Sequence, residues 1–173
     1  QPDKLKRSFV SPHQSFPQLK LMILAEIENC KNGLPSGIWL KCNSLVDHRL
    51  IELLYEASQA GVPIEIVARG ICCLRPGVAG LSETITVRSI IGRFLEHGRI
   101  YVFANGGEFL SDKNIVMISS ADLMPRNLRR RVECFMRLEN PTIRKQVLHQ
   151  IMVALLRDEK NAWYLQPDGS YVH

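Results

Sequence analysis

The sequence predicts a mixed α/β fold, in which a mostly β sheet is flanked by helices on both faces. Three segments carry apolar residues at helical spacing, and these are residues 15–30, 47–59 and 141–156. Seven shorter segments are rich in β-branched and aromatic residues: 38–43, 63–69, 85–90, 97–103, 114–120, 129–138 and 162–165. A strand, a helix and a strand follow one another between residues 38 and 69, which is typical of a crossover unit with parallel strands.

Size and composition favour one domain over residues 1–173. A chain of 173 residues with 46% apolar and 23% charged residues is long enough to bury a full core. The net charge of +5 favours anionic partners such as nucleotides, nucleic acid, polyphosphate or acidic membranes, although an ordinary solvated basic surface explains it equally well. The chain has no apolar run near the ~20 residues of a membrane span and no signal-peptide pattern, so we expect a cytoplasmic location.

The cysteine pattern indicates a reducing compartment. Five cysteines form an odd set without a C-x-x-C pair, and we expect them to pack as small apolar residues. A zinc site is disfavoured because Cys72 and Cys73 are adjacent and no histidine lies at ligand spacing from them. Because the chain starts at Gln1 without methionine, we expect it to be a fragment of something longer.

The first helix follows an extended lead-in over residues 1–13. Ser15 is a candidate N-cap, Pro17 suits the first turn, and the apolar spacing continues to about Cys30. The next strand, 38–43, places Lys41 and Asn43 on one face. A helix over 47–59 ends at Gly61, and strand 63–69 then ends in Arg69. Ligands of parallel sheets bind beyond the carboxyl ends of the strands, where these polar residues fall.

A glycine- and proline-rich loop over 70–83 carries Arg75 and leads to strand 85–90. Residues 92–96 then lead into the strand that begins at His97. The Asn105-Gly106 pair predicts a hairpin, so the strands before and after it are expected to be antiparallel. The Ser119–Asn127 segment is expected to be a polar turn and 129–138 an alternating strand. Pro141 opens the last helix, strand 162–165 follows it, and 167–170 turns the tail.

His97 and Arg99 are the centre of the expected site. Alternation along a strand puts both side chains on one face. We expect them to face the hydroxyls and the amide of the 119–127 turn, at the end of a neighbouring strand. An imidazole can transfer a proton, while fixed cations and hydroxyls orient phosphate oxygens. The residues therefore predict phosphate chemistry. Trp39 and Trp163 are interpreted as core residues.

Several motifs together resemble a known family. They are Lys41–Asp47, Tyr55–Val62, Arg69–Gly77, Arg93–His97 and Ser119–Asn127. In this order they are similar to the last domain of the bacterial polyphosphate kinases, which are ATP-polyphosphate phosphotransferases. The resemblance covers nearly the whole chain and implies one half of a phospholipase D-like fold. In that superfamily two halves meet, and each contributes a histidine to a shared site.

The phospholipase D motif itself is altered. The superfamily pattern is H-x-K followed by a Gly-Ser-x-Asn turn, whereas this chain has His97-Gly98-Arg99 and Ser119-Ser120-Ala121-Asp122. Arginine presents a planar fork in place of a point charge, and aspartate adds an anion. These departures argue against simple phosphodiester hydrolysis and fit a kinase branch.

The resemblance implies reversible transfer of the terminal phosphate of ATP to polyphosphate, with Mg²⁺ shielding the charge. Arg69 and His97 would contact the nucleotide's phosphates. The phosphorylated histidine and the magnesium-associated residues would belong to the preceding domain, so His97 is the partner histidine. Further candidates line a polyphosphate path or form structural ion pairs: Lys41, Asn43, Arg75, Arg99, Arg126 and Arg131. No metal ligand is expected in this chain.

The implied partners are ATP, ADP, inorganic polyphosphate, the preceding domain and further copies of the full enzyme, without nucleic acid or an integral membrane segment. Membrane association of the full enzyme is left open. Two other functions remain. One is a phospholipase D-like phosphodiesterase or nuclease, and the other is a non-catalytic module that binds polyanions. The isolated chain is expected to bind ATP or polyphosphate weakly, with strong salt dependence and no turnover.

Overall fold

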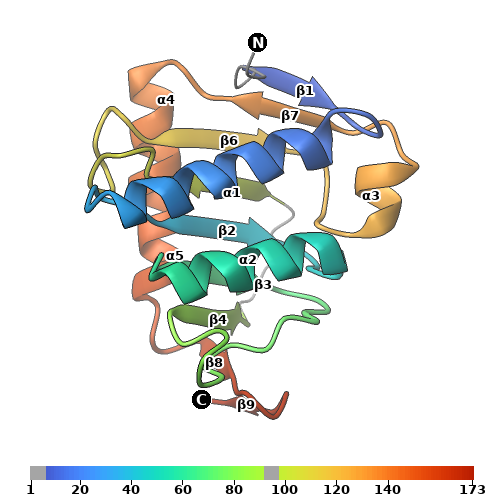
Figure 1. Cartoon of the computed structure of the whole chain (residues 1–173), viewed down its shortest axis with the longest axis vertical. Helices are drawn as coiled ribbons and strands as arrows, with labels where there is room; N and C mark the ends of the chain where they lie inside the picture. The colour runs from blue at the N-terminus through green and yellow to red at the C-terminus, as the bar shows by residue number, and fades with distance from the viewer. Residues whose placement is uncertain (1–6, 92–97) are drawn as a thin grey trace.

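The computed structural model describes residues 7–91 and 98–173, and within them a nine-stranded sheet is the centre of the fold (Figure 1). The strand order is β1-β7-β6-β5-β2-β3-β4-β8-β9. The strands are β1 (Ser8–Val10), β2 (Ile38–Cys42), β3 (Ile64–Ala68), β4 (Ile85–Ile90), β5 (Arg99–Phe103), β6 (Ile115–Ser119), β7 (Cys134–Arg137), β8 (Ala162–Leu165) and β9 (Tyr171–Val172). The helices are α1 (Ser15–Lys31), α2 (His48–Ala60), α3 (Pro125–Arg129), α4 (Pro141–Lys145), η1 (Gln146–Val153) and α5 (Ala154–Arg157).

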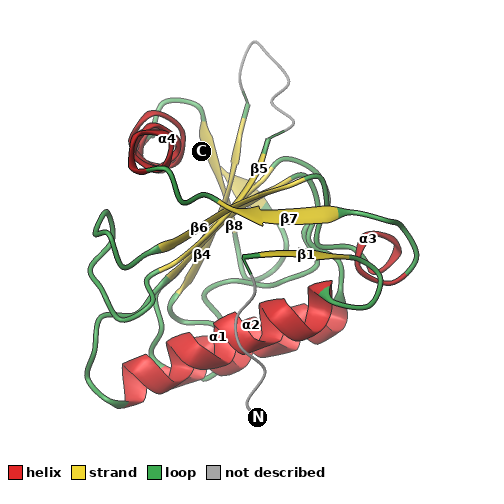
Figure 2. Cartoon of the chain, turned by 90° about the horizontal axis from the view of Figure 1, so that it is seen from above, coloured by secondary structure: helices red, strands yellow, loops and turns green. Residues whose placement is uncertain are grey.

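Helices cover the sheet on both faces, as the sequence predicts. Helices α1 and α2 lie side by side on one face, and the continuous helix α4–η1–α5 crosses the other (Figure 2). The larger core lies under α1 and α2, while a smaller cluster under the long helix joins Val102 and Val116 of the sheet to Leu148 and Met152. Among the described residues, no helix combines the length and apolar character needed to cross a membrane.

The two ends of helix α2 are determined by the residues next to them in the sequence. The carboxylate of Asp47 accepts hydrogen bonds from the backbone N–H groups of Arg49 and Leu50, which otherwise lack partners in the first turn. At the other end Gly61 adopts φ 101°, a left-handed conformation that favours glycine. The apolar stripe between these caps packs on the sheet.

The sheet topology brings strand ends and strand starts to one edge. Strands β2, β3 and β4 are parallel, and β5 lies antiparallel between β2 and β6. Consequently β2, β3, β4 and β6 end where β5 and β7 begin. We call this the strand-end edge, which lies to the right in Figure 1. The predicted parallel crossover and the predicted Asn105-Gly106 hairpin are both confirmed, with Asn105 at φ 55° and Gly106 at φ 79°.

The lead-in over residues 1–13, expected only to be extended, contains a strand. The described part includes β1, which pairs antiparallel with β7. Its anchor is Phe9, which is buried and stacks on Phe135 with 4.7 Å between ring centroids. Three residues with a single buried side chain are too few to produce a recognisable alternation. Ser15 is also not the N-cap: Gln14 occupies that position, and the Ser15 hydroxyl pairs with that of Ser11.

The predicted strand over 129–138 is wrong in its first half. Pro125 begins the short helix α3, and the N–H groups of Arg130 and Arg131 both donate to the carbonyl of Arg126. Proline is favoured in the first helical turn, so it converts the expected polar turn into a helical one. The strand proper, β7, is limited to Cys134–Arg137.

A buried carboxylate joins the first helix to two turns of the sheet. Glu26 of α1 is 1% exposed, and its two oxygens accept hydrogen bonds from the N–H groups of Gly37 at 3.1 Å and Asn105 at 3.0 Å. Burial raises the pKa of Glu26, and the two backbone hydrogen bonds oppose that rise only in part. Glu26 therefore fixes α1 against the sheet.

Candidate functional site

Four polar residues from four segments meet at the strand-end edge. Asn43 follows β2, Arg69 follows β3, Arg99 is the first residue of β5, and Asp122 lies in the turn after β6. Their contacts form a continuous chain of hydrogen bonds. The meeting of Asn43 and Arg69 was predicted from the parallel strand ends, and the central place of Asp122 was not.

Asp122 accepts four hydrogen bonds from described residues. Its Oδ1 accepts from the N–H groups of Asn43 at 2.8 Å and Ser44 at 3.2 Å and from Nε of Arg99 at 3.1 Å. Its Oδ2 accepts from Nη2 of Arg99 at 2.9 Å. Burial pushes the pKa of Asp122 upward, but the Arg99 guanidinium and the two backbone donors outweigh burial and hold the pKa below its ordinary value. The carboxylate is therefore charged and bound on both oxygens.

Arg69 is held by the neighbouring strand end. Its Nε donates to Oδ1 of Asn43 across 3.0 Å, while the N–H of Gly70 donates to the carbonyl of Asn43 across 2.6 Å. The contact is tight, because a Cβ at Gly70 would lie 2.8 Å from that carbonyl oxygen. Asn43 thus joins Arg69 on one side to Asp122 on the other.

A cavity of about 310 Å³ opens beside Arg69, and two aromatic residues, Trp163 and Tyr171, line it together with Gly70, Ser89 and Ile91. The interpretation of Trp163 as a core residue is wrong, because it is 37% exposed. Strand β8 buries Ala162 and Leu165 and turns Trp163 outward. Trp39, by contrast, packs as predicted and stacks on Phe109 at 4.0 Å.

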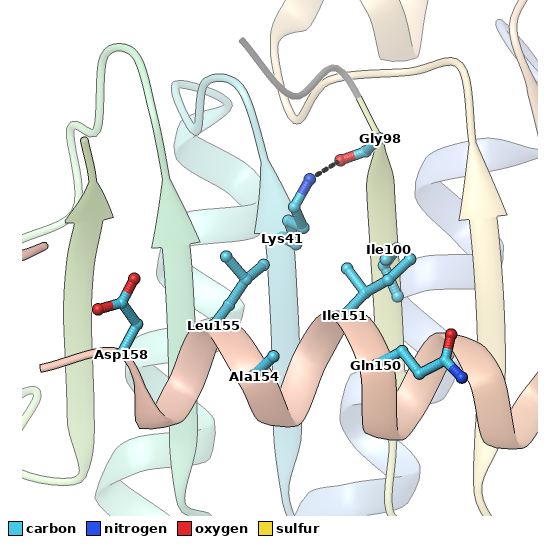
Figure 3. A pocket seen from close by; sticks show the side chains of 8 residues that line it. All are labelled: Lys41, Gly98, Ile100, Gln150, Ile151, Ala154, Leu155 and Asp158. Atoms are coloured by element: carbon cyan, nitrogen blue, oxygen red, sulfur yellow. Dashed lines mark hydrogen bonds between the residues drawn. The ribbon is translucent and has the colours of Figure 1, made fainter. Parts of the chain in front are cut away.

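Lys41 lies on the face of the sheet covered by the long helix. Its Nζ donates to the carbonyl of Gly98 across 2.7 Å, and the residue is 6% exposed. Lys41 lines a cavity of about 420 Å³. Figure 3 shows Ile151 and Leu155 projecting from the helix toward the sheet beside it. The structure does not bring Lys41 to the contacts of Asn43, because Asn43 lies beyond the end of β2 and bonds to Arg69.

The remaining predicted residues have other positions. Arg75 is exposed, with its guanidinium against Gly169 in the turn between β8 and β9. Arg126 is exposed on α3, and Arg131 is exposed in the segment that follows it. His97 lies outside the described residues, as do residues 92–96, so the shared face of His97 and Arg99 stays a prediction.

A second cluster fixes the turn after β6. Glu133 accepts hydrogen bonds from the hydroxyl of Ser120 and from Nδ2 of Asn127, so it joins the turn to α3. In the described part of the chain, no group of three or more histidines, cysteines, aspartates or glutamates is placed to hold a metal ion. The edge is therefore built from arginines, hydroxyls and amides, with its acids engaged by protein donors.

Comparisons with known proteins agree with this geometry. Residues 8–173 match the family described as polyphosphate kinase C-terminal domain 2. The chain belongs to the polyphosphate kinase family. It is 52% identical over 171 residues to polyphosphate kinase of Erythrobacter litoralis and 50% identical over 167 residues to that of Synechocystis. These matches cover 99% and 96% of this chain but 24% and 22% of those proteins, so the chain spans about a quarter of their length.

Solved structures show the same relationship in three dimensions. Polyphosphate kinase from Porphyromonas gingivalis superposes with a TM-score of 0.90 at 37% identity, covering 100% of this chain and 26% of that one. Nuc from Salmonella typhimurium, a phospholipase D family member, gives a TM-score of 0.59 at 15% identity, covering 92% of this chain and 96% of that one. The predicted phospholipase D-like fold is confirmed, and the Nuc match supports the fold alone.

Proposed function

We propose that this chain is the phosphate-contacting half of a polyphosphate kinase active site, folded as one unit over residues 1–173. The enzyme would transfer the terminal phosphate of ATP reversibly to inorganic polyphosphate. The phosphorylated histidine lies in a preceding domain, and His97 acts as the partner histidine beside the phosphates. The full enzyme works as a homo-oligomer in the cytoplasm.

The observation that carries this proposal is the guanidinium of Arg69, oriented by Asn43 beside a cavity at the strand-end edge. Phosphoryl transfer depends on positioning and on stabilising negative charge more than on covalent help from the protein. A planar guanidinium with a fixed Nε matches phosphate oxygens better than a flexible ammonium does. We therefore assign Arg69 as the residue that binds phosphate at this cavity.

Two predicted polyphosphate contacts have a different role in this proposal. Lys41 donates to a backbone carbonyl within a largely apolar cavity wall, and Arg99 forms an ion pair with Asp122. We assign both to holding Gly98 and the first residue of β5, which follow His97 in the sequence. Arg126 and Arg131 remain candidates for contacts with the polyphosphate chain, since both are exposed.

Mg²⁺ does not fit the described residues. At the strand-end edge, the carboxylates of Asp122 and Glu133 already accept hydrogen bonds from arginine, amide and hydroxyl donors. Mg²⁺ requires an octahedron of oxygens, often with one or two carboxylates. We therefore assign its binding to the nucleotide and to the remainder of the enzyme.

The nuclease alternative is less well supported. Arg99 occupies the place of the motif lysine, and Asp122 binds it through both carboxylate oxygens. A phosphodiester would have to compete with this carboxylate for the same guanidinium. The ion pair thus favours the kinase branch.

The test uses the polyphosphate kinase that carries this sequence. Arg69→Ala should lower ATP-dependent polyphosphate synthesis by about a hundredfold, as expected for loss of one charged group that stabilises transferred phosphate. Arg7→Ala is the matched control: Arg7 lies at the opposite edge in an exposed ion pair with Glu139, so its loss should leave the rate unchanged. Wild-type rates in folded Arg69→Ala would overturn the proposal. Robust phosphorylation of the isolated chain by ATP would contradict the location of the phosphohistidine.

A further inference from the structure

We propose that Asp122 is a positioning residue that sets the orientation of two guanidinium groups, that of Arg99 directly and that of Arg69 through Asn43. This inference rests on the proposed function, because it concerns how the phosphate ligand Arg69 is presented. Asp122 itself is 4% exposed and contacts protein donors only among the described residues.

The connection from Asp122 to Arg69 is short and held at each step. Asp122 fixes the N–H of Asn43, whose carbonyl accepts from Gly70 and whose side chain accepts from Arg69. Asn43 is therefore hydrogen-bonded through its backbone N–H, its backbone carbonyl and its side-chain oxygen. A shift of the Asp122 carboxylate therefore moves the backbone of Asn43. The side-chain oxygen of Asn43, which accepts from Nε of Arg69, moves with it.

A carboxylate is the side chain that this position requires. Both of its oxygens accept: Oδ1 serves the backbone of Asn43 and Ser44 together with Nε of Arg99, while Oδ2 serves Nη2 of Arg99. In Asp122→Asn, one of those oxygens becomes an NH₂ group, which would face a donor. The substitution keeps the size of the side chain but leaves it with one acceptor oxygen in place of two.

Charge and positioning predict opposite results for this substitution. A negative charge beside a phosphate site weakens the binding of polyanions, so its removal alone should strengthen binding. If Asp122 positions Arg69, its removal should weaken binding in spite of the added positive charge. The sign of the change in affinity therefore separates the two effects.

Glu133→Gln supplies the matched control. Glu133 is also a carboxylate at the strand-end edge, but its hydrogen bonds go to Ser120 and Asn127. Its charge acts on Arg99 as well, since the pKa of Arg99 is raised chiefly by the hydrogen bonds of Asp122 and to a smaller degree by Glu133. Both substitutions change the net charge by the same amount, and only one breaks the connection to Arg69.

The experiment measures two quantities on the 173-residue chain: the affinity for inorganic tripolyphosphate by calorimetry, and the Nε–Hε signals of Arg69 and Arg99 in NMR spectra. Asp122→Asn should shift both arginine signals and weaken binding by about fivefold, the scale of one ordinary hydrogen bond. Glu133→Gln should leave the Arg69 signal in place and bind as tightly as the wild type or more tightly.

Asn43→Ala protects the test against a folding failure. It retains Asp122 and Arg99 but removes the Oδ1 atom that accepts from Nε of Arg69, so the Arg69 signal should move while the Arg99 signal stays in place, and binding should weaken. An unshifted Arg69 signal in Asp122→Asn, or tighter binding in that variant, would overturn the positioning role. Unchanged binding in Arg69→Ala is a separate result, because it would reject Arg69 as a phosphate ligand while the signal shifts still report the connection.

Discussion

The hydroxyl of Tyr101 donates a 2.6 Å hydrogen bond to the carbonyl of Ala121, and this bond links the middle of β5 to the residue before Asp122. Tyr101 is fully buried, and burial raises the pKa of its hydroxyl well above the ordinary value, so it remains a donor throughout the neutral range. The turn that carries Asp122 is therefore anchored in the core.

Replacing this anchor should cost stability. Tyr101→Phe removes the donor and leaves the Ala121 carbonyl buried without it, so the free energy of unfolding should fall by about 1–2 kcal/mol. Urea unfolding followed by circular dichroism measures the change. Tyr171→Phe, at an exposed tyrosine, should shift it by less than about 0.5 kcal/mol. Equal effects of the two substitutions would contradict the anchoring role of Tyr101.

Asp122 should stabilise the fold in a pH-dependent manner. Its pKa is lower in the folded chain than its ordinary value of 3.8, so its contribution is complete above that value and is lost as the pH falls through the lowered pKa. The difference in unfolding free energy between wild type and Asp122→Asn should be about 2–3 kcal/mol at pH 7 and should shrink below about pH 4. Urea unfolding at a series of pH values tests this. A difference that grows on acidification would contradict it.

Glu26 should show the opposite dependence. Burial raises its pKa above the ordinary 4.5, so the folded chain favours the protonated form. Its contribution is complete below pH 4.5 and is lost as the pH rises through the raised pKa. The stability of the wild type relative to Glu26→Gln should therefore fall from pH 4.5 toward neutrality. The same unfolding series gives the answer, and a constant difference would show that the carboxylate is not destabilised by burial.

The cysteines should differ sharply in reactivity. Cys73 and Cys134 are exposed, whereas burial raises the pKa of Cys72 to about 11 and that of the buried Cys42 still further. Thiolate is the reactive form, so iodoacetamide at pH 8 should label Cys73 and Cys134 first. Mass spectrometry of the native chain follows the order of labelling. Early modification of Cys42 would show that the strand-end edge, where β2 ends, opens readily.

The sequence predicts an element well where the determining contacts are local. Asp47 and Gly61 mark the ends of α2, and the Asn105-Gly106 pair marks the turn after β5, because each acts within a few residues. Strand β1 could not be predicted from local sequence, because it is stabilised by the stacking of Phe9 on Phe135, which is far away in the sequence. Helix α3 is not predicted by its sequence, because the polar residues and the proline of the 119–127 segment are equally typical of a turn.

The contacts of the candidate site also differ in whether the sequence predicts them. Parallel strands place their carboxyl ends together, so the proximity of Asn43 and Arg69 could be predicted. The ion pair between Arg99 and Asp122 and the exposure of Trp163 could not, because each depends on which segment lies beside the residue in the sheet. A signal for Asp122 did exist, since it stands where the phospholipase D pattern has asparagine.

The contact between Asn43 and Asp122 joins residues 79 positions apart, and this has a consequence for synthesis on the ribosome. The nascent chain emerges with Arg99 before Asp122, the carboxylate with which Arg99 forms an ion pair. During that interval the guanidinium of Arg99 lacks this carboxylate and is exposed to ribosomal RNA and cellular polyanions. The turn after β6, which carries Asp122, therefore completes the site and also withdraws this guanidinium from binding to other anions.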